Sequence, residues 1–210
     1  MRLRLLLASI LVLSSLAGCS SEPEIQYQLT AEQLAWQGYQ QGQTLRFANS
    51  STAAVRTYQV VQVTDELIKI GKSSSLWPWS TKGMSAVEHY YALVQRTDNA
   101  STQRITVCSI APTINGDPKM ATCTFDWEGM PIQAELPAEA LNGTIALDSV
   151  TYGAKLLPTA TLGPTSYTQV AKLTRYEYLN SSAAMTLYYA KGKGVVAFSE
   201  AKTGFWYRLP

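Results

Sequence analysis

The 210-residue chain carries 17 Lys and Arg against 15 Asp and Glu, so its formal net charge is only +2. No run of lysine or arginine occurs, and a nearly neutral chain lacks the usual electrostatic basis for binding nucleic acid or an anionic membrane surface. Nucleic acid is therefore excluded as an expected partner.

The first 18 residues have the features of an export signal. Arg2 and Arg4 form a positively charged start, and the apolar run from Leu5 to Leu16 is shorter than the roughly 20 residues that cross a bilayer. The run ends at Leu16-Ala17-Gly18-Cys19 and gives way at once to serine and glutamate. An ordinary signal peptide with a chance cysteine is the alternative interpretation.

This order of features resembles the start of bacterial lipoproteins, with Leu16-Ala17-Gly18-Cys19 in the place of their lipobox. The resemblance implies that residues 1–18 are removed, that the thiol of Cys19 carries diacylglycerol and that the new α-amine is acylated. One acyl chain binds a membrane only reversibly, but three chains such as palmitate on one residue would anchor the protein stably. Residues 19–28 would then form a lipidated, flexible tether.

The residue after the lipidation site bears on the destination of the protein. Ser20 stands where an aspartate would resemble the inner-membrane retention signal of these lipoproteins, so the resemblance implies the outer membrane, with the domain facing either the periplasm or the surface. Removal of Arg2 and Arg4 lowers the count of Lys and Arg from 17 to 15, which equals the count of Asp and Glu. The mature chain is therefore formally neutral.

The remaining range, 29–210, is expected to form one domain, because no linker-like block of Pro, Ser or Gly divides it. A short helix is predicted at its start. Thr30 fits an N-cap, and Gln33 three residues later completes a capping box before Leu34 and Trp36.

After this helix, short β-rich runs alternate with turn residues, and no long segment has a 3.6-residue period. The pattern predicts a mainly β fold, an antiparallel meander that forms a curved sheet or a barrel. Turns are predicted at Thr64-Asp65-Glu66, Asp98-Asn99, Glu128-Gly129, Asn142-Gly143, Gly163-Pro164, Asn180-Ser181-Ser182 and Thr203-Gly204.

Two cysteines remain for a disulfide, Cys108 and Cys123, since an exported chain folds in an oxidising compartment. A tight hairpin at Asn115-Gly116 would place them opposite each other, because paired residue numbers would then sum to 231. Pro112 would fall at a hydrogen-bonded position of that ladder, so a looser loop is the alternative. Two free thiols or a metal pair are the other possibilities, and the metal pair lacks partners because the chain has a single histidine, His89.

The C-terminal segments "LGPTSYTQVAKL" and "LYYAKGKGVVAFSEAKTGFWYRL" resemble the ending of a class of small bacterial surface lipoproteins of unassigned function. That class carries over no catalytic or ligand residue. Lys193 departs from the pattern, which has an aliphatic residue there, and the flanking glycines are interpreted as a bulge or turn between closing strands. The matching positions are Tyr167, Val170, Tyr188, Tyr189, Gly192, Gly194, Val196 and Trp206.

Motifs for catalysis are missing: the sequence has no G-x-S-x-G, no H-E-x-x-H and no paired C-x-x-C. His89 has a pKa range suited to a general base, but it is expected in a strand, on one face with Tyr91, as a structural histidine. Asp126 and Glu128 as a glycosidase pair are less favoured than two solvated acids beside a turn. We therefore expect no enzyme, no catalytic residue, no bound metal and no cofactor.

The segment "KSSSLWPWSTKG", residues 72–83, places Leu76, Trp77 and Trp79 around Pro78 between polar flanks. Proline argues against a central strand, so a loop with apolar side chains is predicted. The loop either folds back over one end of the core or stays exposed and contacts a sugar, a lipid or a partner protein. The exposed form is similar to the protruding apolar loop of outer-membrane lipoproteins that receive other lipoproteins on a curved sheet.

Together these features predict a membrane-anchored envelope lipoprotein that acts as a non-catalytic binding or structural module, with an envelope protein, a glycan or a lipid as partner. A carrier that holds a lipid or another apolar ligand in its curved sheet is the alternative, and a hydrolase ranks last. An unfilled apolar inner face would favour the carrier, whereas a packed interior would favour the binding module.

Overall fold

The computed structural model describes residues 25–71, 84–98, 104–112, 120–128, 130–137, 152–176 and 183–210. The chain divides into two compact units, a smaller one of residues 1–26 and 69–86 and a larger one of residues 27–68 and 87–210. Residues 69–86 of the range predicted as one domain thus belong to the smaller unit.

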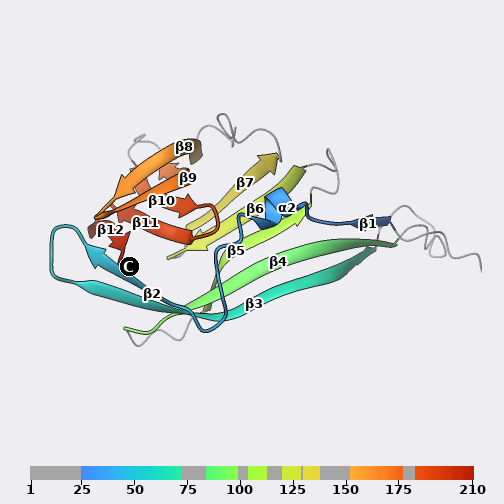
Figure 1. Ribbon diagram of the computed structural model, residues 1–210, viewed down its shortest axis with the longest axis horizontal. Coiled ribbons are helices and arrows are strands. Elements are labelled where there is room, and N and C mark those ends of the chain that lie inside the picture. Colours follow the sequence, from blue (N-terminus) through green and yellow to red (C-terminus); the bar gives the residue numbers. More distant parts are fainter. Residues whose placement is uncertain are drawn as a thin grey trace, which may run out of the picture. The chain divides into compact units, whose positions relative to one another are not determined.

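The described secondary structure is almost entirely β (Figure 1). One short helix lies near the N-terminus, as predicted, and the strands are antiparallel in every pairing between described strands that has a register. The elements are β1 (Ile25–Tyr27), α2 (Ala31–Leu34), β2 (Thr44–Asn49), β3 (Val55–Gly71), β4 (Met84–Arg96), β5 (Arg104–Pro112), β6 (Met120–Trp127), β7 (Met130–Pro137), β8 (Tyr152–Leu162), β9 (Thr165–Tyr176), β10 (Ala183–Ala190), β11 (Gly194–Glu200) and β12 (Gly204–Arg208).

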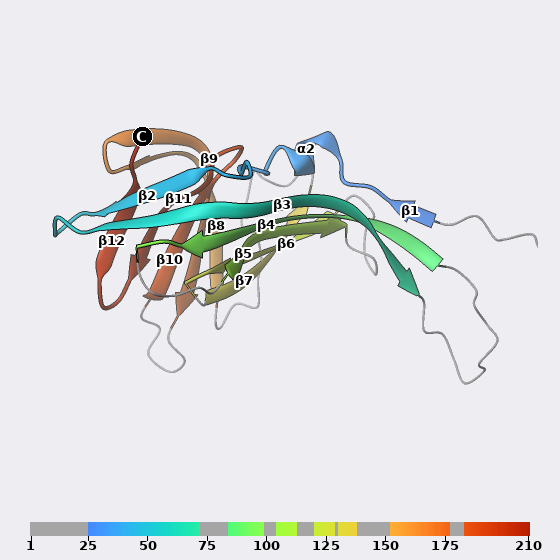
Figure 2. The ribbon, with the colours of Figure 1, turned by 90° about the horizontal axis from the view of Figure 1, so that it is seen from below.

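The strands form two meanders that join edge to edge. Their spatial order is β7-β6-β5-β4-β3-β2-β12-β11-β10-β9-β8, and β1 lies off this path and pairs with β4. The junction is the antiparallel pair β12–β2, in which Trp206 lies opposite Asn49 and Arg208 opposite Phe47. Figure 2 shows β10, β11 and β12 crossing the direction of β2 steeply, as expected for a strongly twisted sheet.

The core of the larger unit lies on the inner face of this sheet. The ring centroid of Phe47 in β2 lies 5.7 Å from that of Tyr58 in β3, 5.4 Å from that of Trp127 in β6 and 5.3 Å from that of Phe198 in β11. Rings from strands far apart in the sheet order therefore meet, and β7 also contacts β9. Both observations require a sheet that curls around its inner face into a half-barrel, which confirms the predicted mainly β, curved antiparallel meander.

The hairpin of β8 and β9 bends over the outer face of its neighbours. Gln169 has a left-handed backbone (φ 50°), and beyond the pair Val170–Ala190 the tip no longer pairs with β10. At the tip, a Cβ on Gly163 (φ 65°) would lie 2.3 Å from the ring of Tyr207 in β12. The first five residues of β11 are consequently buried on both faces of the sheet.

The local predictions had different outcomes. The capping box is confirmed, because Gln33 N donates to the Thr30 hydroxyl at 3.2 Å and Thr30 N donates to the Gln33 side chain at 2.8 Å. The turn predicted at 64–66 is wrong: β3 continues through it, and Asp65 and Glu66 occupy exposed strand positions where polar side chains meet water. Turns are confirmed at Gly163-Pro164, at Glu128 directly after β6, and at residues 201–203.

The cysteine hairpin forms with a different register. Strands β5 and β6 pair antiparallel, with Ile110 opposite Cys123 and Ser109 opposite Thr124, so paired numbers sum to 233 and not to 231. Cys123 therefore lies opposite Ile110, two positions away from Cys108, and the predicted pairing of the two cysteines directly opposite each other is wrong. The turn itself lies outside the described residues, and the disulfide stays a prediction.

Candidate functional site

Several residues singled out in the sequence lie outside the described part of the chain. These are the lipidation site Cys19 and the aromatic loop residues Leu76, Trp77 and Trp79. The loop connects β3 to β4, and its role stays a prediction, as does the anchor. Within the described residues, no helix is both long enough and apolar enough to cross a membrane.

His89 lies in β4 and shares a face with Tyr91, as predicted, since their ring centroids are 5.2 Å apart. The histidine is half-buried, and burial disfavours its charged form. Its pKa is consequently lowered by this burial, although Glu66 acts in the opposite direction. Among the described side chains, no group of three or more His, Cys, Asp or Glu is arranged to hold a metal ion.

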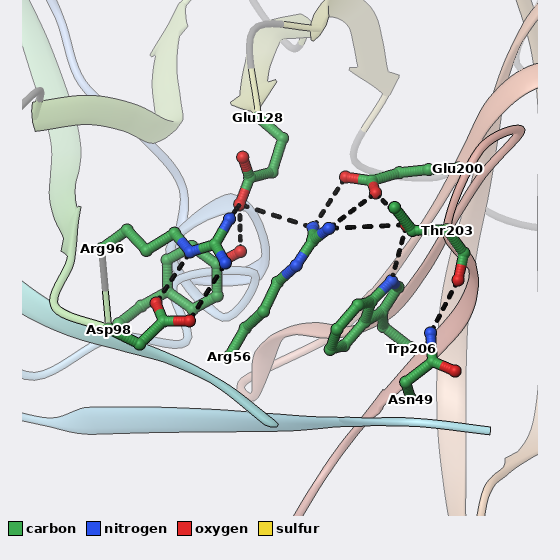
Figure 3. A network of polar contacts seen from close by, with 9 residues as sticks. Asn49, Arg56, Arg96, Asp98, Glu128, Glu200, Thr203 and Trp206 are labelled. Carbon is green, nitrogen blue, oxygen red and sulfur yellow. Dashed lines mark hydrogen bonds and ion pairs between the residues drawn. The ribbon is translucent and has the colours of Figure 1, made fainter. Parts of the chain in front are cut away.

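A network of charged side chains gathers where several strands begin or end (Figure 3). Alternate turns of an antiparallel meander lie at the same end of the sheet, so residues distant in sequence meet there. We call it the Arg56 network. Its members are Asn49, Arg56, Tyr58, Arg96, Asp98, Glu128, Glu200, Thr203 and Trp206.

Arg56, at the start of β3, is the centre of this network. Its guanidinium donates to both carboxylate oxygens of Glu200, at 2.7 and 2.9 Å, and its carbon lies 4.1 Å from the ring centroid of Trp206. Burial alone would lower the pKa of Arg56, but the hydrogen bond and charge of Glu200 raise it above its ordinary value. For Glu200 the directions are reversed: burial alone would raise its pKa, but the bonds from Arg56 and Thr203 hold it below its ordinary value.

Glu128 connects this pair to the second arginine. It has a left-handed backbone (φ 51°) in the turn after β6, and its carboxylate lies 3.7 Å from Arg56 and 3.6 Å from Arg96. The hydroxyl of the buried Tyr58 donates to it, and burial together with the charge of Glu128 raises the pKa of Tyr58. Arg96 also forms a bidentate pair with Asp98, at 2.7 and 3.0 Å.

The carboxylates of the Arg56 network are thus held by guanidinium groups or hydroxyls. Glu128, which the sequence offered as one half of an acid pair with Asp126, contacts two arginines and a tyrosine. Such an arrangement closes one end of the core and fixes the strand ends, because each buried charge is compensated.

A second arrangement is built on the turn between β10 and β11. The Tyr39 hydroxyl accepts the Val195 N–H at 2.8 Å, and the Tyr189 hydroxyl donates to the Trp36 carbonyl at 2.9 Å. These bonds attach the segment after α2 to the turn. The approach is so close that a Cβ on Gly38 would lie 2.0 Å from the Gly194 nitrogen, and a Cβ on Gly194 (φ 77°) would lie 2.5 Å from the Tyr39 ring, so both positions require glycine.

Two adjacent cavities flank this attachment and share Lys193 and Arg208 in their walls. Their volumes are about 270 and 340 Å³. The other lining residues come from the segment that follows α2, from β2 and from the β8–β9 hairpin. We call the pair the basic groove. The side chains that matter for its chemistry are Arg46, Lys193, Arg208, Tyr167, Gln40 and Gln43.

The cations of the basic groove have no ion pair within the described part of the chain. Arg46 and Lys193 are exposed and Arg208 is half-buried, and none of the three forms an ion pair with a described carboxylate. Arg208 is oriented by one bond, from its Nη1 to the backbone carbonyl of Lys193 at 2.6 Å. An arginine held in this way presents its remaining N–H groups to an anion at little entropic cost.

No known protein family, curated protein or solved structure matches the chain. Function therefore has to be argued from the residues themselves.

Proposed function

We propose that the protein is a membrane-anchored envelope lipoprotein that acts as a non-catalytic binding module, with the basic groove as its contact site. One observation carries this proposal: three cations, Arg46, Lys193 and Arg208, line two adjacent cavities without an ion pair among the described residues. Unpaired charges that converge on a concave surface are typical of a site for an oppositely charged ligand.

The packing of the larger unit supports a binding module over a carrier of apolar ligands. A carrier needs an inner face with room for its cargo. Here large side chains that are under 2% exposed occupy that face. They are Trp36, Trp127, Tyr39, Tyr58, Tyr189, Phe47, Phe198 and Leu45.

The anchor is tested by the variant Cys19→Ser in a bacterial host grown with labelled palmitate. We expect label in the wild-type chain and none in the variant, because the thiol and the new α-amine at residue 19 are the proposed acylation sites. Cys108→Ser is the matched control and should keep the label. Equal labelling of wild type and Cys19→Ser would contradict the anchor.

The contact site is tested by binding to purified envelope fragments from which the membrane lipid has been removed, so that the proposed anchor cannot contribute. The full chain should co-sediment with them, and the double variant Arg46→Gln/Lys193→Gln should bind about tenfold more weakly or worse, because two charge-assisted contacts are lost. Lys202→Gln, which removes an exposed charge outside the groove, should bind like the wild type. Co-sedimentation that the double variant leaves unchanged would exclude the groove as the contact site.

A further inference from the structure

The composition of the basic groove indicates the ligand class, and the following inference rests on the function proposed above. We propose that the groove binds an acidic glycan, a chain of sugars that carries carboxylate or phosphate groups. Three features of the groove support this ligand class: the unpaired cations, the mixed polar and apolar lining around them, and the fixed position of the wall that carries Lys193.

The cations of the groove differ from a neighbouring lysine that is neutralised. Lys191, two residues before Lys193, forms an ion pair with Glu32. Lys193 in the β10–β11 turn and Arg46 in β2 have no such partner among the described residues. A planar guanidinium such as that of Arg208 matches the geometry of carboxylate and phosphate oxygens.

The rest of the lining offers both polar and apolar contacts, as the edges and faces of a sugar require. Glutamines border the smaller cavity, whereas Tyr167, Leu209 and Pro210 give the larger cavity an apolar part. Gln40 is exposed, and the Gln43 side-chain oxygen accepts the Gln40 N–H at 3.3 Å, which leaves the Gln43 amide nitrogen as a donor. Tyr167 adds a half-buried ring of the kind that packs on a sugar face. By contrast, the large hydrophobic side chains that are exposed in the described residues belong to β3 and do not line the groove: Val55, Leu67 and Ile68.

The wall that carries Lys193 is held in place before any ligand binds. Gly38 packs directly on the backbone of Lys193 and Gly194, and the Tyr39 hydroxyl accepts the N–H of Val195. A preformed wall reduces the ordering cost of binding, which matters for a hydrated ligand whose groups exchange water for protein contacts. Two adjacent cavities with Lys193 and Arg208 in common also suit a chain ligand, in which one sugar lies at each cavity.

The test is calorimetric titration of the chain from residue 19 onward with Cys19→Ser, which lacks the proposed anchor and needs no detergent that would dissolve vesicles. The probes are oligomers of galacturonic acid, their fully methyl-esterified counterparts of equal length, phosphorylated oligosaccharides, inorganic phosphate and vesicles of phosphatidylglycerol. We expect an acidic oligomer to bind and its neutral counterpart to bind about tenfold more weakly or worse. Added salt should weaken the binding of the acidic oligomer.

Variants connect this binding to the groove. Arg46→Gln/Lys193→Gln should lose about tenfold or more in affinity for the acidic oligomer, and Lys202→Gln should lose none. Equal affinity for acidic and esterified oligomers, or binding of the vesicles or of phosphate without binding of any oligosaccharide, would overturn the inference. If the groove variant loses envelope binding while no acidic oligosaccharide binds, the glycan inference fails and the proposed contact site stands. If neither envelope nor glycan binds, both fail.

Discussion

Replacing Arg56 by methionine is expected to lower the free energy of unfolding by about 3–5 kcal/mol at pH 7, the usual cost of removing one partner of a buried ion pair. The side chains of Arg56 and Glu200 are only 9% and 20% exposed, so water screens this pair weakly. Without the guanidinium, Glu200 loses both of its 2.7 and 2.9 Å bonds to arginine, and Trp206 loses the cation over its ring.

The effect of Arg56→Met should depend on pH in a defined direction. In the folded protein the pKa of Glu200 is held below its ordinary value of 4.5, so its contribution is present above that value and is lost as the pH falls through the folded pKa. The variant lacks this contribution, since the buried carboxylate has no cation. Urea unfolding should therefore show a large difference in the free energy of unfolding between wild type and variant at pH 7, and a smaller difference in acid.

A matched control lies on the neighbouring strand. Arg46 in β2 is exposed and has no ion pair among the described residues, so Arg46→Met should change the free energy of unfolding by no more than about 0.5 kcal/mol. If Arg56→Met and Arg46→Met cost the same, the Arg56 network is not what closes this end of the core.

The position of Arg56 had a signal in the sequence. It alternates with Tyr58 and Val60, and both of these are fully buried, so period-2 alternation places a charge on an inward face. A buried arginine requires a compensating acid. The sequence does not say which acid, because Glu128 and Glu200 reach Arg56 only through turns at distant points of the chain.

Local rules predicted what local interactions decide. The capping box at Thr30 depends on residues three positions apart, and the Gly163-Pro164 turn depends on two neighbours, so both could be read directly. The turn at Thr64-Asp65-Glu66 failed because exposed strand positions accept the same polar residues as turns. Composition at such a position does not distinguish the two states.

The basic groove could not be predicted, because its cations come from three separate segments. Arg46, Lys193 and Arg208 meet only when β2 pairs with β12 and the β10–β11 turn folds beside them. One partial signal was present, the lysine between Gly192 and Gly194 in a place where the C-terminal pattern has an aliphatic residue. A charge in a tight turn is usually solvated, so that signal pointed to no site by itself.

Gly38→Ala is the second change with a large expected effect. The new Cβ would lie 2.0 Å from the Gly194 nitrogen and 2.5 Å from the Lys193 carbonyl carbon, and neither backbone atom has room to yield as a flexible side chain would. The segment after α2 would have to separate from the β10–β11 turn, with loss of the Tyr39–Val195 bond. We expect a loss of about 3 kcal/mol in the free energy of unfolding, measured by urea titration.

Gly42→Ala separates this steric effect from the conformational one. Gly42 belongs to the same segment and has a left-handed backbone (φ 83°), but a Cβ there would meet nothing within 4 Å. Gly42→Ala should lower the free energy of unfolding only by the cost of a left-handed backbone at alanine, about 1 kcal/mol. Gly38 has no such backbone requirement, so the two alanines test different causes. If Gly42→Ala destabilised the protein as much as Gly38→Ala, the contact of the segment after α2 with the β10–β11 turn would not be the source of stability. Other bonds would then have to hold the wall of the basic groove.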